Sequence, residues 1–382
     1  MELSIRTNGQ KVLNQKSNDQ STLGDFLEIH RGARHIVILQ DFPDPDAISS
    51  AFVHKLISSR FDIDVDIVYS GVISHQQNIA LVKLLGIELV KYVPEIDLTQ
   101  YDGVVFVDNQ GTTAKDLVSR LEAAGVKFLI LIDHHELQNV IQAEYSDIRP
   151  LGATATIYAQ YMKDGLFELD RSNKQHVLAA TALMHGIMSD TGNFIQARDE
   201  DFQAASYLSH FADAQTLKEI MSQSRSKQTM EVIHRAIANR MILQTFSISG
   251  VGYLRAEDRD AIPQAADFLL TEENVHTALV YGIVTDENHS EKLVGSFRTT
   301  KITMDADGFM KEVFGKNEAG EYFGGGKEFA GGFVIPIGFL VGSFNEEYSN
   351  LKWQLYSQQV KHLLLEKMGV KDSPVEGKSS SS

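Results

Sequence analysis

The hydrophobic pattern of the first half of the chain alternates between two kinds of segment. Short apolar runs rich in β-branched residues lie at 35–39, 63–69, 104–107 and 128–132. Between them, apolar residues recur at helical spacing over 47–58, 78–85 and 113–124. Short, continuously apolar runs are typical of strands buried on both faces. Strands separated by helices therefore predict a parallel sheet covered by helices on both sides.

The pattern changes character in the second half. Residues 153–208 carry further helical patterns, and we expect one long polar-faced helix over 216–244. Strand-like runs follow at 246–255, 278–285 and 292–298, before a glycine-rich stretch at 324–332. We predict an α/β protein with an N-terminal parallel-sheet domain, a linker helix, a smaller α/β C-terminal domain and a disordered, low-complexity tail. Their expected bounds are 1–215, 216–244, 245–365 and 366–382.

Composition narrows the class of protein. The 382 residues are 43% hydrophobic and 23% charged, as in a globular protein. There is no cysteine, so neither disulfides nor a thiolate metal site can form. The sequence begins without a signal-peptide pattern, and its longest uncharged stretch is too short and glycine-rich to span a bilayer. We therefore expect a cytoplasmic protein with no membrane partner.

Net charge bears on the kind of ligand. The formal net charge is −16, from 51 acidic and 35 basic residues, and no dense run of lysine and arginine occurs. Proteins that track long nucleic acids usually carry a basic stripe, because neutralisation of phosphates supplies most of their affinity. The composition therefore favours a small anionic ligand over a long polymer.

Carboxylates gather where the predicted strands of the first domain end. Asp44 and Asp46 follow the first strand in QDFPDPDAISS, Asp108 ends VVFVD, and Asp133 ends LILID. Ligands of parallel sheets bind beyond the carboxyl ends of the strands, so these side chains are expected at one edge. Crowded carboxylates repel one another unless a cation lies among them. The pattern indicates a cation site.

Histidines extend this set of candidate ligands. The segment IDHHE adds His134 and His135 at a strand end, and HGIMSDTGNF adds Asp190. Aspartate and imidazole together are the ligands expected of Mn²⁺ or a similar divalent ion. Two neighbouring ions that share one bridging carboxylate would need about this inventory of ligands.

These motifs together carry a resemblance to a known family. The order PDPDA, an aspartate ending a strand, IDHH and SDTG resembles the DHH phosphoesterase superfamily. The later SFRTT and GGGKEFAGGF resemble the C-terminal DHH-associated domain of its nano-RNase and single-strand exonuclease branch. The resemblance implies a two-domain phosphodiesterase with two Mn²⁺ or Mg²⁺ ions in the cleft between the domains.

The resemblance also implies roles for individual residues. One metal would be bound by Asp44 and Asp108, with Gln40 where the family usually has histidine. The other would be bound by Asp46, Asp108, His134 and Asp190, so that Asp108 bridges the two ions. His135 would face the scissile phosphate. The rest of the substrate would be held by Arg298, by the backbone of Gly324, Gly325 and Gly326, and by Lys327.

Three positions depart from the family pattern. Gln40 replaces the usual histidine, and a glutamine oxygen is a poorer Mn²⁺ ligand than imidazole. We therefore expect the first metal to bind more weakly or to arrive with the substrate. Lys327 replaces a histidine of the glycine loop, and Ser49 replaces a glycine of the first motif.

Each assignment has a structural alternative. Asp44 and Asp46 alone would be typical of a proline-bracketed turn with a helix N-cap, and Asp108 could cap the helix near residue 113. Asp190 could serve a turn, Arg298 could be a surface salt-bridge residue, and the GGG run could be a flexible loop. The coincidence of four motifs in order favours the functional interpretation for the aspartates.

We weigh three functions. The first is a metal-dependent phosphodiesterase that hydrolyses short oligonucleotides or linear dinucleotides to mononucleotides with water activated by two metal ions. The second is a phosphatase acting on pyrophosphate, polyphosphate or a nucleoside bisphosphate. The third is a nucleotide-binding protein with a weakened metal site, for which Gln40 is the support. We favour the first, because a pyrophosphatase needs no surface for a nucleoside. Relatives often pair, which allows a homodimer.

Overall fold

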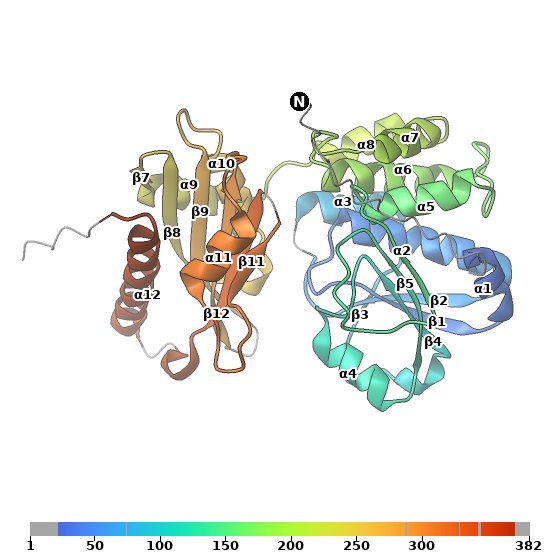
Figure 1. The fold of residues 1–382 in the computed structure, drawn as a ribbon, viewed down its shortest axis with the longest axis horizontal. Coiled ribbons are helices and arrows are strands. Elements are labelled where there is room, and N and C mark those ends of the chain that lie inside the picture. The colour runs from blue at the N-terminus through green and yellow to red at the C-terminus, as the bar shows by residue number, and fades with distance from the viewer. Residues whose placement is uncertain (1–21, 74, 287–288, 328, 343–344, 371–382) are drawn as a thin grey trace, which may run out of the picture. The chain divides into compact units, whose positions relative to one another are not determined.

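Two compact units make up the chain in the computed structural model (Figure 1). The structure describes residues 22–73, 75–286, 289–327, 329–342 and 345–370. The first unit comprises Met1–Gly71 and Glu88–Asp213, and the second comprises Val72–Ile87 and Ala214–Ser382. Among the described residues, none of the helices combines the length and the apolar character that crossing a membrane requires.

The first unit is built on a six-stranded sheet in which every pair of neighbours is parallel. Its strands, in spatial order, are β3 (Val90–Lys91), β2 (Asp64–Tyr69), β1 (Arg34–Ile38), β4 (Gly103–Val107), β5 (Lys127–Asp133) and β6 (Tyr145–Ile148). The predicted parallel sheet is confirmed. The two edge strands were not predicted, because β3 has two residues and the sequence YSDI of β6 is half polar.

Helices cover both faces of this sheet. They are α1 (Leu23–Ile29), α2 (Pro45–Ser58), α4 (Lys115–Ala123), α5 (Thr154–Lys163), α6 (Lys174–Asp190) and α7 (Asp199–Ser209). Figure 1 shows α4 on one side of the sheet, and α2, α5 and α6 on the other. On the α4 side, Ile38 and Phe106 of the central strands pack with Leu117 of the helix. Strands buried on both sides explain the unbroken apolar runs in the sequence.

The strand order places a switch point between β1 and β4. From β1 the chain continues to β2 on one side, whereas β4 lies on the other side of β1. The loops that leave β1 and β4 therefore diverge at the carboxyl edge of the sheet, where open α/β sheets bind ligands. Asp46 lies in the first turn of α2, directly after the loop that leaves β1. Asp108 lies in the loop that leaves β4.

A close backbone approach fixes the loop after β1. A Cβ atom on Gly71 would lie 1.7 Å from the carbonyl oxygen of Asp41, so this position has no room for a side chain. The Ser70 hydroxyl donates a hydrogen bond of 2.5 Å to Asp41 Oδ1. Asp41 thus anchors its loop to the end of β2.

The second unit contains a mixed six-stranded sheet in the order β11-β12-β10-β9-β8-β7. Neighbours are antiparallel except β8 and β9, which are parallel. The elements are α3 (Gln76–Leu85), α8 (Ala214–Met221), α9 (Lys227–Asn239), β7 (Met241–Leu243), β8 (Phe246–Arg255), α10 (Ala261–Leu269), β9 (Thr277–Thr285), β10 (Glu291–Thr299), α11 (Ala306–Phe314), β11 (Gly324–Gly326), β12 (Ala330–Pro336) and α12 (Glu346–Lys367). Short 3-10 turns at Ser59–Phe61, Leu98–Gln100, Ala256–Asp258 and Gly338–Leu340 complete the two units.

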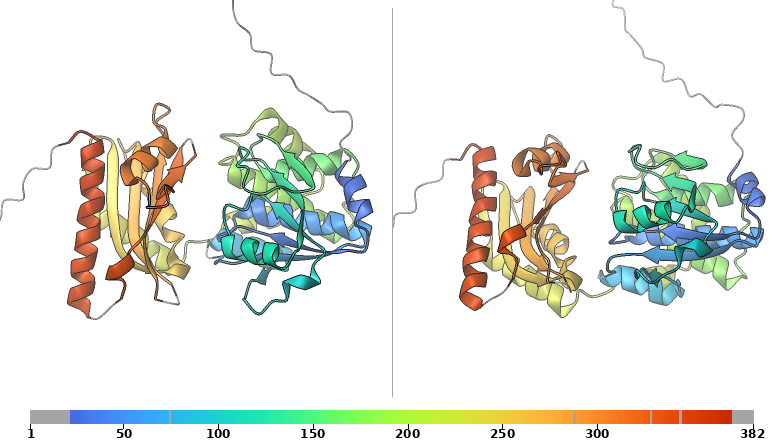
Figure 2. Two further views of the ribbon diagram at one scale, coloured as in Figure 1. Left: turned by 60° about the horizontal axis from the view of Figure 1, so that its bottom comes forward. Right: turned by 90° about the horizontal axis from the view of Figure 1, so that it is seen from below.

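Two hydrophobic clusters cover the faces of this second sheet. Tyr281 and Phe297 pack with Met310 of α11 and Leu364 of α12 on one face. Val280 packs with Ile262 of α10 and Val232 of α9 on the other. Figure 2 shows α12, in red, running along its face of the sheet. The prediction of a smaller α/β second domain is confirmed.

The single helix expected over 216–244 is wrong. Two helices, α8 and α9, occupy the segment and are followed by β7. The break lies in the sequence SQSRS, and the Ser226 side chain accepts from the backbone N–H of Thr229 as the N-cap of α9. Serine side chains compete with helical backbone hydrogen bonds and favour caps.

The two remaining predictions for this half also differ from the structure. The predicted tail over 366–382 begins inside α12, which runs to Lys367, and its residues 371–382 lie outside the described residues. The GGG run is not a loop, because Gly324–Gly326 form β11, paired with β12.

A buried ion pair attaches α12 to the second sheet. Lys352 Nζ lies 2.5 Å from Glu291 Oε2, and their side chains are 1% and 4% exposed. Lys352 also donates to the carbonyl of Gly342. We expect Lys352→Met to lower the free energy of unfolding of this unit by about 3–5 kcal/mol, because it leaves Glu291 buried without its cation.

The fluorescence of Trp353 measures this effect, because Trp353 is the one tryptophan of the chain and lies in α12. Urea unfolding followed at this residue should shift strongly for Lys352→Met. The double variant Lys352→Met/Glu291→Leu should recover most of the loss, and exposed Lys292→Met should change little. Equal stability of Lys352→Met and wild type would rule out the ion pair as an anchor.

Two buried histidines in the first unit predict sensitivity to acid. Burial lowers the pKa of His35 to about 4, with a smaller contribution from His30, and lowers the pKa of His54 to about 3. Neither ring nitrogen of His35 has a hydrogen-bond partner among the described residues, and His54 Nδ1 lies 3.0 Å from the Tyr158 hydroxyl.

The sign follows from proton linkage. In the unfolded chain the imidazole of His35 takes up its proton near pH 6.5, whereas in the folded chain it does so only near pH 4. The free energy of unfolding is therefore highest above pH 6.5 and falls as the pH drops toward 4. The pKa shift of His35 alone should lower the free energy of unfolding by about 2–3 kcal/mol between pH 7 and pH 4.5. Urea unfolding followed by circular dichroism at both pH values measures this loss. His35→Leu should flatten the dependence and exposed His234→Gln should not. An unchanged pH dependence in His35→Leu would contradict the assignment.

Candidate metal centre

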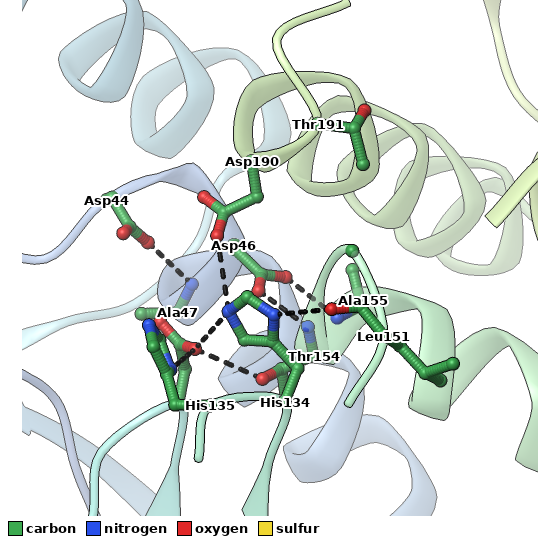
Figure 3. Close-up of polar contacts among 12 residues, drawn as sticks. Asp44, Asp46, Ala47, His134, His135, Leu151, Thr154, Ala155, Asp190 and Thr191 are labelled. Atoms are coloured by element: carbon green, nitrogen blue, oxygen red, sulfur yellow. Dashed lines mark hydrogen bonds and ion pairs between the residues drawn. The ribbon is translucent and has the colours of Figure 1, made fainter. Parts of the chain in front are cut away.

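Asp46 lies in the first turn of α2 and is fully buried. Its two carboxylate oxygens accept hydrogen bonds of 2.7 Å from the backbone N–H groups of Thr154 and Ala155 (Figure 3). Burial, together with the nearby charge of Asp190, raises its pKa to about 8. The fold thus holds a carboxylate in place and surrounds it with negative charge.

Asp108 follows β4 in an unusual backbone conformation, with φ at 53°. It is buried, and the Thr154 hydroxyl donates to its Oδ1 at 3.1 Å. Burial, Asp44 and Asp46 raise its pKa well above the usual range. The alternative role of Asp108 as a helix cap is wrong, because α4 begins at Lys115 with Ala114 as N-cap.

His134 directs one ring nitrogen into this group of carboxylates. Its Nδ1 lies 3.0 Å from the carbonyl oxygen of Leu151. Its Nε2 lies 3.3 Å from Asp190 Oδ2 and 3.5 Å from Asp108 Oδ1, yet forms no properly oriented hydrogen bond among the described residues. Burial lowers the pKa of His134, but Asp190 and Asp46 outweigh it and raise the pKa to about 9.

Asp190 is the last residue of α6. A carboxylate at a helix C-terminus faces the negative end of the helix dipole, which is unfavourable without a compensating cation. Its side chain is 12% exposed and turns toward His134 (Figure 3). Thr191, the next residue, bonds through its hydroxyl to the Ile187 carbonyl and accepts from the Phe194 N–H. Thr191 therefore makes these turn contacts, while Asp190 faces the cluster.

The arrangement fits a divalent cation. Ligand atoms of Asp46, His134 and Asp190 all lie within 4.8 Å of one another, and so do those of a second group, which consists of Asp108, Asp133, His134 and His135. A buried imidazole nitrogen without a properly oriented hydrogen bond, set among carboxylates of raised pKa, indicates a position suited to a positively charged ligand. Mixed oxygen and nitrogen ligands of this kind suit Mn²⁺ and related ions.

Two residues predicted to bind the first metal, Gln40 and Asp44, form hydrogen bonds with other protein groups. Gln40 Nε2 lies 3.1 Å from the carbonyl oxygen of Asp108 and 2.9 Å from its Oδ2. Because both neighbours are acceptors, the amide nitrogen, not the oxygen, faces Asp108. Asp44 caps α2 and accepts from the N–H of Ala47 through Oδ1, as its structural alternative requires. This first position fits a metal less well than the Asp46–His134–Asp190 group.

His135 is oriented by Asp133. The backbone N–H and the Nδ1 of His135 lie 2.8 Å and 2.7 Å from Asp133 Oδ1. Burial raises the pKa of Asp133, but these contacts outweigh burial and leave it below its usual value. The His135 side chain is 25% exposed, so its ring remains accessible to a ligand.

The predicted substrate-binding residues lie in the second unit. Arg298 is on β10, with Nε 2.8 Å from Asp267 Oδ1 and one NH group donating to the Ser296 hydroxyl. The N–H of Gly326 donates to Asp307 Oδ1, and the N–H of Lys327 donates to the Ala330 carbonyl. Gly324 and Gly325 pair with β12. These donors therefore have protein partners, and their substrate role stays a prediction.

Sequence reasoning missed the segment that runs from the loop after β6 into the first turn of α5. Leu151, Thr154 and Ala155 supply the backbone groups that orient His134 and Asp46. These contacts with His134 and Asp46 are made by the main chain, which any residue type possesses, so the sequence ATAT carries no signal of them beyond a helix start.

The chain was compared with known proteins. The model of the DHH family, N-terminal domain, matches residues 35–187. An uncharacterized protein of Methanocaldococcus jannaschii is 35% identical over 348 residues, which cover 90% of this chain and 66% of that protein. A probable manganese-dependent inorganic pyrophosphatase of Streptococcus pyogenes is 26% identical over 153 residues, 39% of this chain and 45% of that protein. The chain thus spans less than two thirds of the length of either relative.

A solved structure agrees with the fold. An exopolyphosphatase-related protein from Bacteroides fragilis superposes with a TM-score of 0.62 at 16% identity, covering 88% of this chain and 95% of that one. The family model thus identifies residues 35–187 as similar to the N-terminal domain of the DHH family.

Proposed function

We propose that this protein is a metal-dependent phosphodiesterase that hydrolyses short oligonucleotides or linear dinucleotides to mononucleotides. The observation that carries the proposal is the convergence of the ligand atoms of Asp46, His134 and Asp190, beside which Asp108 Oδ1 lies 3.5 Å from His134 Nε2. The motifs of the second unit support the nucleotide part of the proposal, since SFRTT and GGGKEFAGGF resemble the DHH-associated domain.

Asp46, Asp108, His134 and Asp190 would hold the principal ion. Mn²⁺ is favoured by the mixed carboxylate and imidazole ligands and by the relative described as manganese-dependent, and Mg²⁺ is the second choice. When bound, a divalent ion supplies a Lewis acid for the phosphoryl oxygens and a lowered pKa for water.

The chain's own residues perform the remaining tasks. Asp133 holds the Nδ1 side of His135, so the imidazole is fixed in orientation and can hydrogen-bond a phosphate oxygen through its other nitrogen. Asp46, fixed by two backbone N–H groups, keeps its place as ligands and substrate exchange. We assign nucleotide contacts to Arg298, Gly324, Gly325, Gly326 and Lys327. Arg298 would exchange its ion pair with Asp267 for a phosphate, and because this pair is partly exposed the exchange costs little.

A phosphatase acting on pyrophosphate or polyphosphate is the second candidate. It is favoured by the pyrophosphatase relative and by the name of the Bacteroides fragilis protein. The pyrophosphatase match covers 39% of this chain, however, and thus leaves most of the chain unaddressed. Nucleoside bisphosphates belong to the same alternative, and binding without turnover remains the third.

One panel of substrates separates these functions. The protein is incubated with Mn²⁺ and, separately, labelled 2-mers to 7-mers, cyclic dinucleotides, a nucleoside bisphosphate, pyrophosphate and polyphosphate. Mononucleotide release from 2-mers is the expected result. Orthophosphate from pyrophosphate or polyphosphate alone would overturn the phosphodiesterase proposal in favour of the second candidate. Binding of 2-mers without turnover would support the third.

A further inference from the structure

A second buried carboxylate lies behind the candidate metal centre. Asp201, in the first turn of α7, is fully buried. It accepts hydrogen bonds from the Thr156 hydroxyl at 2.6 Å, the N–H of Arg198 at 2.8 Å and the N–H of Gly152 at 3.1 Å. The protein itself thus satisfies this carboxylate with three hydrogen-bond donors.

Asp201 bonds to the segment that orients the metal centre. Residues 151–155 make four contacts with predicted ligands. The Leu151 carbonyl meets His134 Nδ1, the N–H groups of Thr154 and Ala155 meet Asp46, and the Thr154 hydroxyl meets Asp108. Figure 3 shows this segment beside the His134 ring.

The contact with Gly152 is tight. A Cβ atom on Gly152 would lie 2.2 Å from Asp201 Oδ2 and 2.6 Å from Thr191 Cγ2. The carboxylate therefore packs directly on the backbone between Leu151 and Thr154, beside the residue that follows Asp190. The Arg198 guanidinium adds a further attachment by donating to the Pro150 carbonyl.

We propose that Asp201 is a positioning residue that sets the affinity of the centre for its divalent ion. It acts through Gly152 and Thr156, which hold the 151–155 segment where its Leu151 carbonyl accepts a hydrogen bond from His134 Nδ1 when the ion is bound at Nε2. The lone pair of Nε2 then faces Asp46 and Asp190. Groups that orient metal ligands in this way typically change affinity when they are altered. The inference rests on the proposed metal-dependent function, but not on any choice of substrate.

Isothermal titration with Mn²⁺ tests the proposal on the full chain. In Asp201→Asn, an NH₂ group replaces an oxygen that faces N–H donors, and the Kd for Mn²⁺ should rise about 10–100-fold. Exposed Asp199→Asn, the same change of charge in the same helical turn, is the matched control and should bind as wild type does. Nitrogen-15 shifts of the His134 ring, recorded with an excess of diamagnetic Mg²⁺, should show the Nδ1–H tautomer in wild type and a mixture of forms in Asp201→Asn.

Each outcome has a distinct meaning. Wild-type Mn²⁺ affinity and tautomer in a folded Asp201→Asn variant would overturn the proposal, even if its thermal stability fell. Should that variant fail to fold, Thr156→Val decides, because it removes one donor and keeps the shape of the side chain. Weaker Mn²⁺ binding in Thr156→Val supports the proposal and unchanged binding rejects it. Failure of wild type itself to bind Mn²⁺ would instead reject the proposed function.

Discussion

Replacing Asp108 by asparagine should abolish turnover while leaving the protein folded. The side chain lies in both predicted metal positions and is buried among acidic groups. Asparagine keeps its shape and, unlike alanine, is well suited to the left-handed backbone at φ 53°. We expect the rate to fall by on the order of 1,000-fold or more, because the charge that holds the ion is lost. Metal content by mass spectrometry should fall as well, and Asp108→Ala should lose both activity and metal.

The stability of the Asp108→Asn variant shows whether any loss of activity comes from unfolding. Without metal, the carboxylates of Asp108, Asp44 and Asp46 repel one another, so neutral Asp108→Asn should be as stable as metal-free wild type or more so. Exposed Asp116→Asn, at the start of α4, should change neither property. Near-normal activity in Asp108→Asn, at full metal content, would refute the assignment of this residue.

Replacing Gln40 by histidine should increase the number of tightly bound ions. The Gln40 amide now donates to Asp108 Oδ2 and so occupies an acceptor that a first metal would use. An imidazole would offer a lone pair in its place, which is the better ligand for Mn²⁺. Mn²⁺ retained after gel filtration should rise from about one to about two ions per chain, with affinity at the new position higher by about 10-fold or more.

A histidine placed outside the ligand set controls for this gain. Gln138 is exposed and follows the IDHH segment, so Gln138→His should leave the metal content unchanged. Two ions already bound with equal affinity in wild type would contradict the blocking role of the Gln40 amide. An unchanged count in Gln40→His would do the same.

The clustering of the candidate ligands at one sheet edge could be predicted from sequence because it depends on local patterns. Asp108 and Asp133 directly follow or end unbroken apolar runs, and a parallel sheet brings such ends to one edge. The order of motifs then indicated the superfamily. Helical periodicity also persisted across the segment 216–244, which hid the break at Ser226, since a cap competes with helix propensity over a few residues.

Other features depend on contacts between distant segments and so left no signal in the sequence. The orientation of His134 is set by a carbonyl 17 residues away, and that of Gln40 by a carboxylate 68 residues away. Asp201 appears in the sequence as one of several acidic residues at a helix start, yet only it is buried against Gly152. Residue types predicted the chemistry of the centre, whereas its geometry needed the fold.

The most direct test of this account is a manganese anomalous difference map from crystals grown or soaked in Mn²⁺. The account predicts a strong peak within coordination distance of His134 Nε2, Asp46 and Asp190, with Asp108 completing the set. The position beside Gln40 should be weaker or filled only when a phosphate ligand is present. A map without density among these side chains, in crystals where Mn²⁺ binds elsewhere, would contradict the metal centre and the hydrolytic mechanism built on it.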